Sequence, residues 1–427
     1  MLPKQSAVAK QTLKDQKPMA VRMVELAQEL FPLEDLALYW SVRIFLTWHD
    51  VPIGSLDIAN AYQSVSVETL AKEIAKAPDL DFSHEHLLKC LPPERMPEHL
   101  SVSVIIPTCN RPEDLRRCLE NLDRQRTDRF VEVIVVDNSP GSGLTPPVLE
   151  KFPNVKLVNE WRPGASYARN AGIKYSQGDI IITIDDDVTP PPHWLEQLIS
   201  PLMQENVMAV TGNILPLELE TPAQQLFEIY GMGGLCRGFC LFKMDGSQLP
   251  KSRVAIPVWE LGASANAAFW AKIFQHPEIG LWEERLGAGV PVGGGEDLFL
   301  FYKILRAGFT HVYTPNAYVW HKHRRDMASL RRQIYGYSQG IIAHHIMTLR
   351  YYADWRAIVA IATMPIYYYK RARWQMMGKL RYPISLLLQE VLGHFMAAWG
   401  LLKSYQHGKS QPLSPCPTIQ QDSPKHL

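Results

Sequence analysis

Three consecutive carboxylates at the end of an apolar run have a spacing that suggests chemistry. Asp185, Asp186 and Asp187 follow the β-branched residues 181–184. Like charges this close raise one another's pKa, so the group needs a cation or strong donors nearby. On a strand Asp185 and Asp187 would share a face while Asp186 points the other way, and two oxygen ligands on one face suit Mg²⁺ or Mn²⁺. The alternative is structural, because Asp187 and Thr189 could cap the following helix.

A second acidic pair, Glu296 and Asp297, follows three glycines and precedes an apolar helical run. A carboxylate placed there by a flexible loop can take a proton from an incoming hydroxyl, as a general base does. Acidic residues are also common at helix N-termini for electrostatic reasons alone. Further along, His321 and His323 would share one face of a strand, where a neutral imidazole can complete a divalent-metal site or simply lie at the surface.

Two more segments suit an anionic nucleotide. Asp137 follows an apolar strand, where its carboxylate could accept hydrogen bonds from a base or ribose, although an Asp-Asn-Ser turn needs no ligand. Residues 162–170, RPGASYARN, combine a tight turn, a helix N-terminus and two arginines. An ordinary turn with a solvated arginine explains that pattern equally well.

These side chains need a scaffold, and an α/β fold supplies one. From Val102 onward apolar strands alternate with helical segments, as a mainly parallel sheet with helices on both faces requires. The predicted strands are 101–108, 131–138, 155–160, 179–186 and 207–214, and the predicted helices are 112–123, 166–176 and 191–203. Ligands of such sheets bind beyond the carboxyl ends of the strands, where Thr108, Asp137 and Asp185 all fall.

The remaining chain is divided by composition and periodicity. We predict a flexible tail at 1–18, a small α+β module at 19–98, the α/β domain at 99–326, a helical region at 327–404 and a disordered tail at 405–427. Within the module we predict a helix at 19–36, a strand at 38–47, a turn at 49–54 and a helix at 67–77.

The composition is ordinary for a soluble globular protein. A net charge of +1 gives no general attraction to nucleic acid, so no nucleic-acid partner is expected. The six cysteines match neither a disulfide framework nor a zinc site, which favours free thiols in a reducing compartment. The N-terminal residues lack the apolar core of a secretion signal, so we expect a cytoplasmic protein. Segments 357–369 and 383–402 are too short or too interrupted by polar residues to predict a membrane span.

Short motifs occur in a fixed order between about residues 101 and 340. They are SVIIPTCNRPEDLRRCLENL, VEVIVVDNSP, PGASYARNAGI, GDIIITIDDDVTPPPHWLEQL, VTGNILP, GASANAAF, GGEDLFLFYKILRAG and VWHKH. In this order the region resembles an inverting, nucleotide-sugar-dependent glycosyltransferase of family 2, which has the GT-A fold. The phrase LELETPAQQLFEIYG and the short N-terminal module resemble those of a bacterial subgroup.

The resemblance implies a role for each matching residue. The nucleotide-sugar-binding residues would be Thr108, Asn110, Arg111, Asp137, Arg169, Asp185 and Asp186. The metal ligands would be Asp185, Asp187 and His321, with His323 as the alternative histidine. Asp297 would be the general base and Glu296 would help to orient the acceptor.

The implied reaction moves one sugar from a nucleoside-diphosphate sugar to an acceptor hydroxyl, in the synthesis of a cell-surface polysaccharide, glycolipid or glycan. The hydroxyl, deprotonated by Asp297, would attack the anomeric carbon opposite the leaving diphosphate, which inverts the configuration. Mn²⁺ or Mg²⁺ would stabilise charge on the diphosphate. The acceptor is either soluble or lipid-linked.

Two other functions remain as alternatives. Processive polysaccharide synthases carry a Gln-x-x-Arg-Trp signature, whereas residues 370–374 here read Lys-Arg-Ala-Arg-Trp, which favours single-sugar transfer. A non-catalytic sugar-nucleotide-binding protein would have no need of Glu296 and Asp297. Residues 367–374, with Lys379 and Arg381, have the aromatic and basic mix of an interfacial element. A solvated helix face explains them too, so association with the inner face of the plasma membrane stays open.

Overall fold

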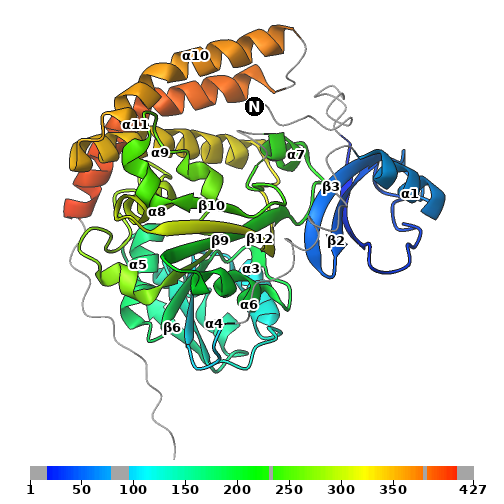
Figure 1. Cartoon of the computed structure of the whole chain (residues 1–427), viewed down its shortest axis with the longest axis horizontal. Coiled ribbons are helices and arrows are strands. Elements are labelled where there is room, and N and C mark those ends of the chain that lie inside the picture. The colour runs from blue at the N-terminus through cyan, green and yellow to red at the C-terminus, as the bar shows by residue number, and fades with distance from the viewer. Residues whose placement is uncertain (1–16, 78–95, 230–233, 378–381, 411–427) are drawn as a thin grey trace, which may run out of the picture.

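The computed structural model of the chain describes residues 17–77, 96–229, 234–377 and 382–410. Figure 1 shows a large sheet with helices around it, a small sheet at its side and long helices across one end. The tail predicted at 1–18 and the tail predicted at 405–427 lie largely outside the described residues. The domain limits stay predictions.

The large sheet is parallel in one half and mixed in the other. Its parallel strands are β4 (Val102–Thr108), β5 (Val131–Asp137), β6 (Val155–Asn159) and β7 (Ile180–Ile184), in the order β7-β4-β5-β6. All four overlap the predicted strands, but β7 ends at Ile184, so Asp185 and Asp186, predicted on the strand, follow its end. The β-branched residues of β4 and β7 are buried on both faces, as a covered parallel sheet requires.

The other half of the sheet departs from the predicted mainly parallel arrangement. β11 (Asn266–Trp270) runs antiparallel to both β7 and β9 (Val207–Pro216). β12 (Thr310–His321) is parallel to β9, and β10 (Phe242–Asp245) and β8 (Val188–Thr189) pair antiparallel with β12. β11 was not predicted because Asn266 and the small residues Ala267 and Ala268 give no alternating signal.

Helices cover both faces of this sheet. One core cluster joins Val104, Ile182 and Trp194 under α3 and α6, and the other joins Ile105 and Ile181 under α5 and α8. Successive strand residues therefore serve opposite layers. The helices are α3 (Pro112–Leu122), α4 (Pro146–Leu149), α5 (Ala165–Tyr175), α6 (Trp194–Ile199), α7 (Pro222–Ile229) and α8 (Glu296–Arg306). Short 3₁₀ turns are η3 (Pro140–Ser142), η4 (Ser200–Met203), η5 (Gly246–Lys251), η6 (Val258–Leu261) and η7 (Ala271–Gln275).

The N-terminal residues form a three-stranded sheet, β1 (Met19–Glu25), β2 (Ser41–Trp48) and β3 (Val51–Ala59), with α1 (Val67–Lys76) beside it. The helix predicted at 19–36 is wrong: Met19–Glu25 pairs in parallel with β2, and this tertiary pairing overrides the local pattern. The turn predicted at 49–54 is tighter, because β3 begins at Val51.

The small sheet packs against the large one. Phe45 of β2 contacts Leu215 and Tyr318 in a shared apolar cluster. Arg43, also on β2, forms an ion pair with Glu228 of α7 at 3.0 Å. The small sheet is thus attached beside the carboxyl ends of β9 and β12.

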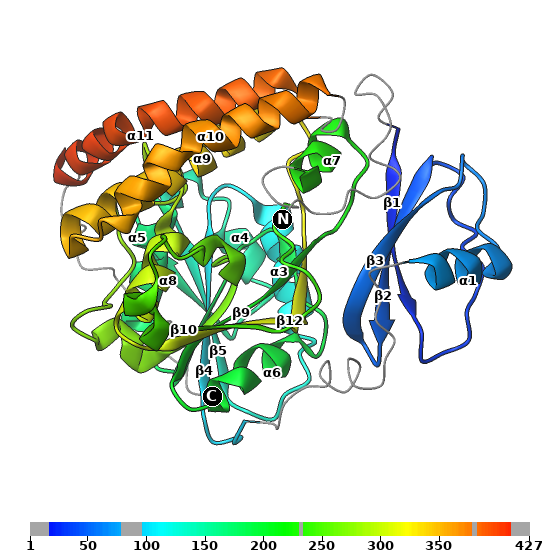
Figure 2. The same ribbon diagram turned by 45° about the horizontal axis from the view of Figure 1, so that its top comes forward.

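Three long helices end the described chain: α9 (Met327–Tyr352), α10 (Arg356–Met376) and α11 (Ile384–Ser410). Figure 2 shows them lying together along one side. By length and composition Ile384–His407 could cross a membrane, although segment 383–402 was not predicted to be a span. Of the most apolar 18-residue window of this helix, 33% is buried inside the protein. α11 lies against α9 so closely that a Cβ at Gly393 would be 2.7 Å from the Tyr335 carbonyl oxygen.

Candidate active site

A cavity of about 2280 Å³ opens at the carboxyl ends of the strands. Its wall includes most of the predicted site residues: Thr108, Arg111, Arg169, Asp185, Asp186, Asp187, Glu296, Asp297 and His321. Asn110, Asp137 and His323 are not on this wall. The strand-end placement predicted for the site therefore holds for residues that come from five separate segments.

Asp185, Asp187 and His321 form a cluster in which one ligand atom from each lies within 4.8 Å of the others. The pairing of β8 with β12 sets His321 opposite Val188, which brings its ring beside Asp187. His321 Nε2 lies 3.3 Å from Asp187 Oδ1. These are the three residues that the resemblance implied as metal ligands, and their donor set could hold a divalent cation.

Electrostatics prepare this cluster for a cation. Burial alone would raise the pKa of Asp187, but His321, Arg111 and Arg324 outweigh it and hold that pKa below its ordinary value. Burial lowers the pKa of His321, which favours the neutral imidazole that a metal requires. His323 lies behind His321, and its Nε2 is 2.9 Å from Glu228 Oε1.

Arg111 compensates the middle carboxylate. Its Nη1 donates to Asp186 Oδ1 at 3.0 Å and to Asp187 Oδ2 at 2.8 Å. Thr108 Oγ1 donates to Asp186 Oδ2 at 2.8 Å. Burial and the neighbouring Asp187 nevertheless raise the pKa of Asp186 to about 7. The guanidinium of Arg111 therefore supplies part of the positive charge that the three carboxylates require.

Arg169 of α5 connects the metal cluster to the acidic pair. It is 3% exposed, and its two terminal nitrogens lie 3.0 Å from Asp185 Oδ1 and 3.3 Å from Glu296 Oε1. Burial and Asp297 raise the pKa of Glu296 to about 7. Burial also raises the pKa of Asp297, against the hydrogen bond from the Leu298 N–H and the charge of Arg169.

The glycine run before Glu296 is packed rather than loose, contrary to the flexible loop predicted from the sequence. A Cβ on Gly293 would lie 2.9 Å from Gly336 Cα, and one on Gly295 would lie 2.5 Å from the Gly340 carbonyl oxygen. Gly295 also has a φ of 88°. Glycine is therefore required for close contact with α9, and this contact fixes the start of α8 and with it Asp297.

Asp137 is buried but turned into its own loop. Its Oδ1 accepts a hydrogen bond from the Ser139 N–H at 2.8 Å, as the turn interpretation predicts. Its Oδ2 has no hydrogen-bond partner among the described residues. The next residue, Asn138, does line the cavity.

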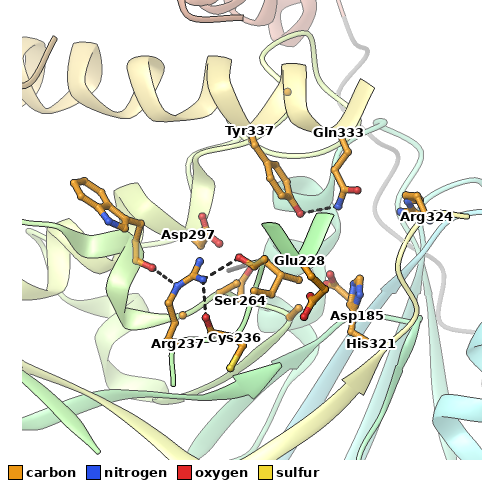
Figure 3. A pocket seen from close by; sticks show the side chains of 18 of the residues that line it. Asp185, Glu228, Cys236, Arg237, Ser264, Asp297, His321, Arg324, Gln333 and Tyr337 are labelled. Carbon is orange, nitrogen blue, oxygen red and sulfur yellow. Dashed lines mark hydrogen bonds between the residues drawn. The ribbon is translucent and has the colours of Figure 1, made fainter. Parts of the chain in front are cut away.

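Several cavity residues were missed in the sequence. They are Glu228 of α7, Arg237 after the glycine-rich segment, Arg324 after β12, and Gln333 and Tyr337 of α9 (Figure 3). Arg324 adjoins the predicted histidines and could have been found from that proximity. Glu228 lies within the phrase LELETPAQQLFEIYG, but nothing in that phrase indicates its role, and only the tertiary fold places the remaining residues here.

Residues 103–239 match the family model described as glycosyl transferase family 2. The chain contains a family 2 glycosyltransferase domain. This match confirms, for residues 103–239, the family and the glycosyltransferase class that the sequence motifs implied. The pre-mycofactocin glycosyltransferase of Mycobacterium tuberculosis is 28% identical over 260 residues, which are 59% of this chain and 49% of the relative. Glycosyltransferase AglE of Haloferax volcanii is 34% identical over 119 residues, 26% of this chain and 39% of the relative.

The match thus spans about half the length of the pre-mycofactocin glycosyltransferase and less than half of AglE. Among solved structures, the mannosyltransferase PcManGT from Pyrobaculum calidifontis in complex with GDP-Man and Mn²⁺ has a TM-score of 0.43 at 18% identity, covering 77% of this chain and 81% of that chain. GalNAc-T7 with UDP, GalNAc and Mn²⁺ also has a TM-score of 0.43, at 17% identity, covering 75% and 59%. These scores are too low to carry an argument about the site.

Proposed function

We propose that this glycosyltransferase moves one sugar, with inversion, from a nucleoside-diphosphate sugar to an acceptor hydroxyl, and that it requires Mn²⁺ or Mg²⁺. One observation carries the proposal: the cluster of Asp185, Asp187 and His321 faces the same cavity as Asp297, and Arg169 connects the two groups. A diphosphate and a base must lie on the two sides of an anomeric carbon for inversion.

The donor set supports a hard divalent cation. Two carboxylates and one neutral imidazole leave coordination positions for diphosphate oxygens and water, as Mg²⁺ and Mn²⁺ sites commonly do. Bound there, the cation would stabilise the charge that develops on the leaving diphosphate. Arg324 Nη1 lies 3.8 Å from Asp187 Oδ2 and is placed to bind a diphosphate oxygen as well.

The nucleoside would lie at the ends of β4 and β5. Thr108 and Arg111 hold Asp186 there, and Asn138 lines the cavity while its side-chain amide is hydrogen-bonded to the backbone of residues 160–164. The second carboxyl oxygen of Asp137 lacks a partner among the described residues, so it can accept a hydrogen bond from a base after a small movement of the loop.

Asp297 would take the proton of the acceptor hydroxyl. Its raised pKa brings its basicity closer to neutrality, where a general base is most effective. Glu296 is held by Arg169 and stays partly protonated near neutrality, so it can both accept and donate hydrogen bonds when it orients the acceptor.

The C-terminal helices support contact with a lipid surface. An exposed apolar stripe follows α11 at helical spacing: Ile384, Leu388, Leu392, Phe395, Trp399 and Leu402. Phe395 is 80% exposed, while Gly393 and Gly400 hold the other side of α11 against α9. A helix with one face on its own protein and an apolar opposite face suits the membrane interface better than a span. We therefore propose peripheral association, with a glycan or glycolipid product.

A processive synthase is the second candidate, because residues of the Lys-Arg-Ala-Arg-Trp segment on α10 line the same cavity. Lys370, Arg371 and Trp374 belong to its wall, and Arg371 is paired with Glu390 of α11. The length distribution of the products separates the two functions. Single-sugar transfer gives one added residue, whereas a processive enzyme gives long chains early in the reaction.

The test is a screen of purified protein for binding and hydrolysis of UDP-, GDP- and dTDP-sugars, with Mn²⁺, Mg²⁺ or chelator. Asp187→Asn should lose metal-dependent donor binding, whereas Asp297→Asn should bind the donor and lose turnover. Asp245→Asn, at a carboxylate outside the cavity, is the control. Donor binding that is indifferent to Asp187 and to chelator, or turnover that is indifferent to Asp297, would reject the proposal.

A further inference from the structure

The cavity contains a guanidinium that the donor reaction does not use. Arg237 lies on its wall, on the same side as Asp297 and away from Asp185 and His321 (Figure 3). The cavity volume of about 2280 Å³ exceeds the few hundred to about 1,000 Å³ of typical small-molecule sites, so a second substrate fits beside the donor.

Three of the five N–H donors of Arg237 are anchored to the main chain. Its Nε donates to the Trp259 carbonyl oxygen at 2.7 Å, and its Nη1 donates to the carbonyl oxygens of Gly234 at 3.0 Å and Cys236 at 3.2 Å. These bonds fix the plane of the guanidinium. The two N–H groups of Nη2 have no hydrogen bond within the described part of the chain.

Arg237 also differs from four other arginines of the cavity wall in its charge balance. Arg43, Arg111, Arg169 and Arg371 each form an ion pair with at least one carboxylate. Arg237 forms none with any described residue, and Asp297 is the carboxylate whose charge acts on it. Arg237 is half-buried, and this burial lowers its pKa while no described carboxylate forms an ion pair with it.

A fixed, half-buried guanidinium with two free N–H groups on Nη2 is suited to donate to the oxygens of an oxyanion such as phosphate or carboxylate. The diphosphate of the donor would bind on the other side of the cavity, through the cation at Asp187 and His321 and directly to Arg324. We propose that Arg237 binds an anionic group of the acceptor and so positions the acceptor hydroxyl beside Asp297. This inference rests on the proposed function.

The chemistry shared by the candidate acceptors is an oxyanion close to a hydroxyl. The phosphate could belong to a lipid carrier or to a small sugar phosphate, and the carboxylate to an acidic sugar. Three probes separate these sources: farnesyl phosphate, glycerol 3-phosphate and glucuronate. Glycerol, which lacks the charge, is the neutral match.

The experiment is a calorimetric titration of the full chain with each probe, in the presence of saturating Mn²⁺ and the nucleoside diphosphate found in the donor screen. We expect at least one anionic probe to bind and glycerol not to bind. Arg237→Met should lower the affinity for the anionic probe about tenfold or more, which is the size of effect typical of charge-assisted hydrogen bonds. It should leave the nucleotide affinity within about twofold of the wild-type value. Arg332→Met, at an exposed arginine of the same cavity wall, is the matched control.

Arg237→Lys provides a second variant, because it keeps the charge while losing the planar pair of donors. It should give an intermediate affinity, and it keeps the proposal testable if Arg237→Met fails to fold. Absence of anion binding to the wild type, or equal anion affinity in folded Arg237→Met, would overturn the proposal. Either result, with metal-dependent donor hydrolysis intact, would leave the proposed transferase function standing.

Discussion

His323 stands directly behind His321, with their Nδ1 atoms 2.9 Å apart. The Nε2 of His323 faces the carboxylate of Glu228, which can only accept when ionised, so this nitrogen carries the proton of a neutral His323. Its Nδ1 then accepts from His321, and the Nε2 of His321 is left with a lone pair directed at Asp187. The pair of histidines thus sets the tautomer that a metal ligand needs.

Glu228→Gln should therefore weaken Mn²⁺ binding, by about 10- to 100-fold as is typical when the partner of a ligating histidine is lost. The glutamine amide can donate a hydrogen bond to Nε2 of His323. This would permit the tautomer in which Nε2 of His321, the nitrogen that faces Asp187, carries a proton. Calorimetric or electron paramagnetic resonance titration of Mn²⁺ measures the effect. Glu218→Gln, whose carboxylate pairs with Arg325 instead, is the control. Unchanged Mn²⁺ affinity in Glu228→Gln would mean that the histidine relay does not tune the site.

Replacing the base should separate chemistry from binding. Asp297→Asn is expected to lower kcat about 10²- to 10⁴-fold, the usual contribution of general-base catalysis, with donor affinity nearly unchanged. Steady-state transfer and donor titration on the same preparation check this. A parallel loss of donor affinity in a folded variant would place Asp297 in the donor site instead.

Stability should depend on pH through Glu296. Its pKa of about 7 in the folded protein lies above its ordinary value of 4.5, so the fold binds this proton more tightly than the unfolded chain does. The resulting stabilisation is full below pH 4.5 and is lost as the pH rises through 7. Glu296→Gln should flatten the fall of Tm between pH 5 and 8, as differential scanning fluorimetry would show. An unaltered slope would contradict the raised pKa.

The contact between Gly295 and Gly340 predicts a backbone-level effect on catalysis. In Gly340→Ala the new Cβ would lie 2.5 Å from Gly295 N, so the glycine run and Asp297 must shift. We expect a loss of about 1–3 kcal/mol in the free energy of unfolding and a reduced kcat. Gly141→Ala, where the nearest atom is 3.7 Å away, should change neither quantity in thermal unfolding and transfer assays. Wild-type stability and kcat in Gly340→Ala would show that the contact is not required.

The exposed stripe of α11 predicts binding to anionic vesicles. Phe395→Asp should reduce cosedimentation with phosphatidylglycerol vesicles, because it places a charge in the middle of the apolar face. Phe31→Asp changes an aromatic residue that is 67% exposed in the loop between β1 and β2, and it should have no effect. A wild-type protein that stays in the supernatant would reject peripheral association.

Local patterns in the sequence were sufficient for the parallel strands, whereas the family resemblance supplied the grouping of Asp185, Asp187 and His321. Successive side chains in residues 102–108 and 180–184 pack into two opposite layers. The positions of these strands also fix where the carboxylates at their ends lie. The strand β1 could not be predicted, because its pairing with β2 is a tertiary choice. The ion pairs of Arg111 and Arg169 also escaped prediction, since each joins residues that only the fold brings together. The glycine run was predicted to be a flexible loop, because its contacts with α9 leave no trace in its own composition.

The packing of α11 on α9, and of α9 on the glycine run, has a geometric consequence. Contacts link the exposed stripe of α11 through α9 to the glycine run before Asp297, so we expect the height of this base above a surface under α11 to be fixed. An acceptor anchored in that surface would have to span this height with its head group. The protein would then select acceptors by the distance between their membrane anchor and their reactive hydroxyl.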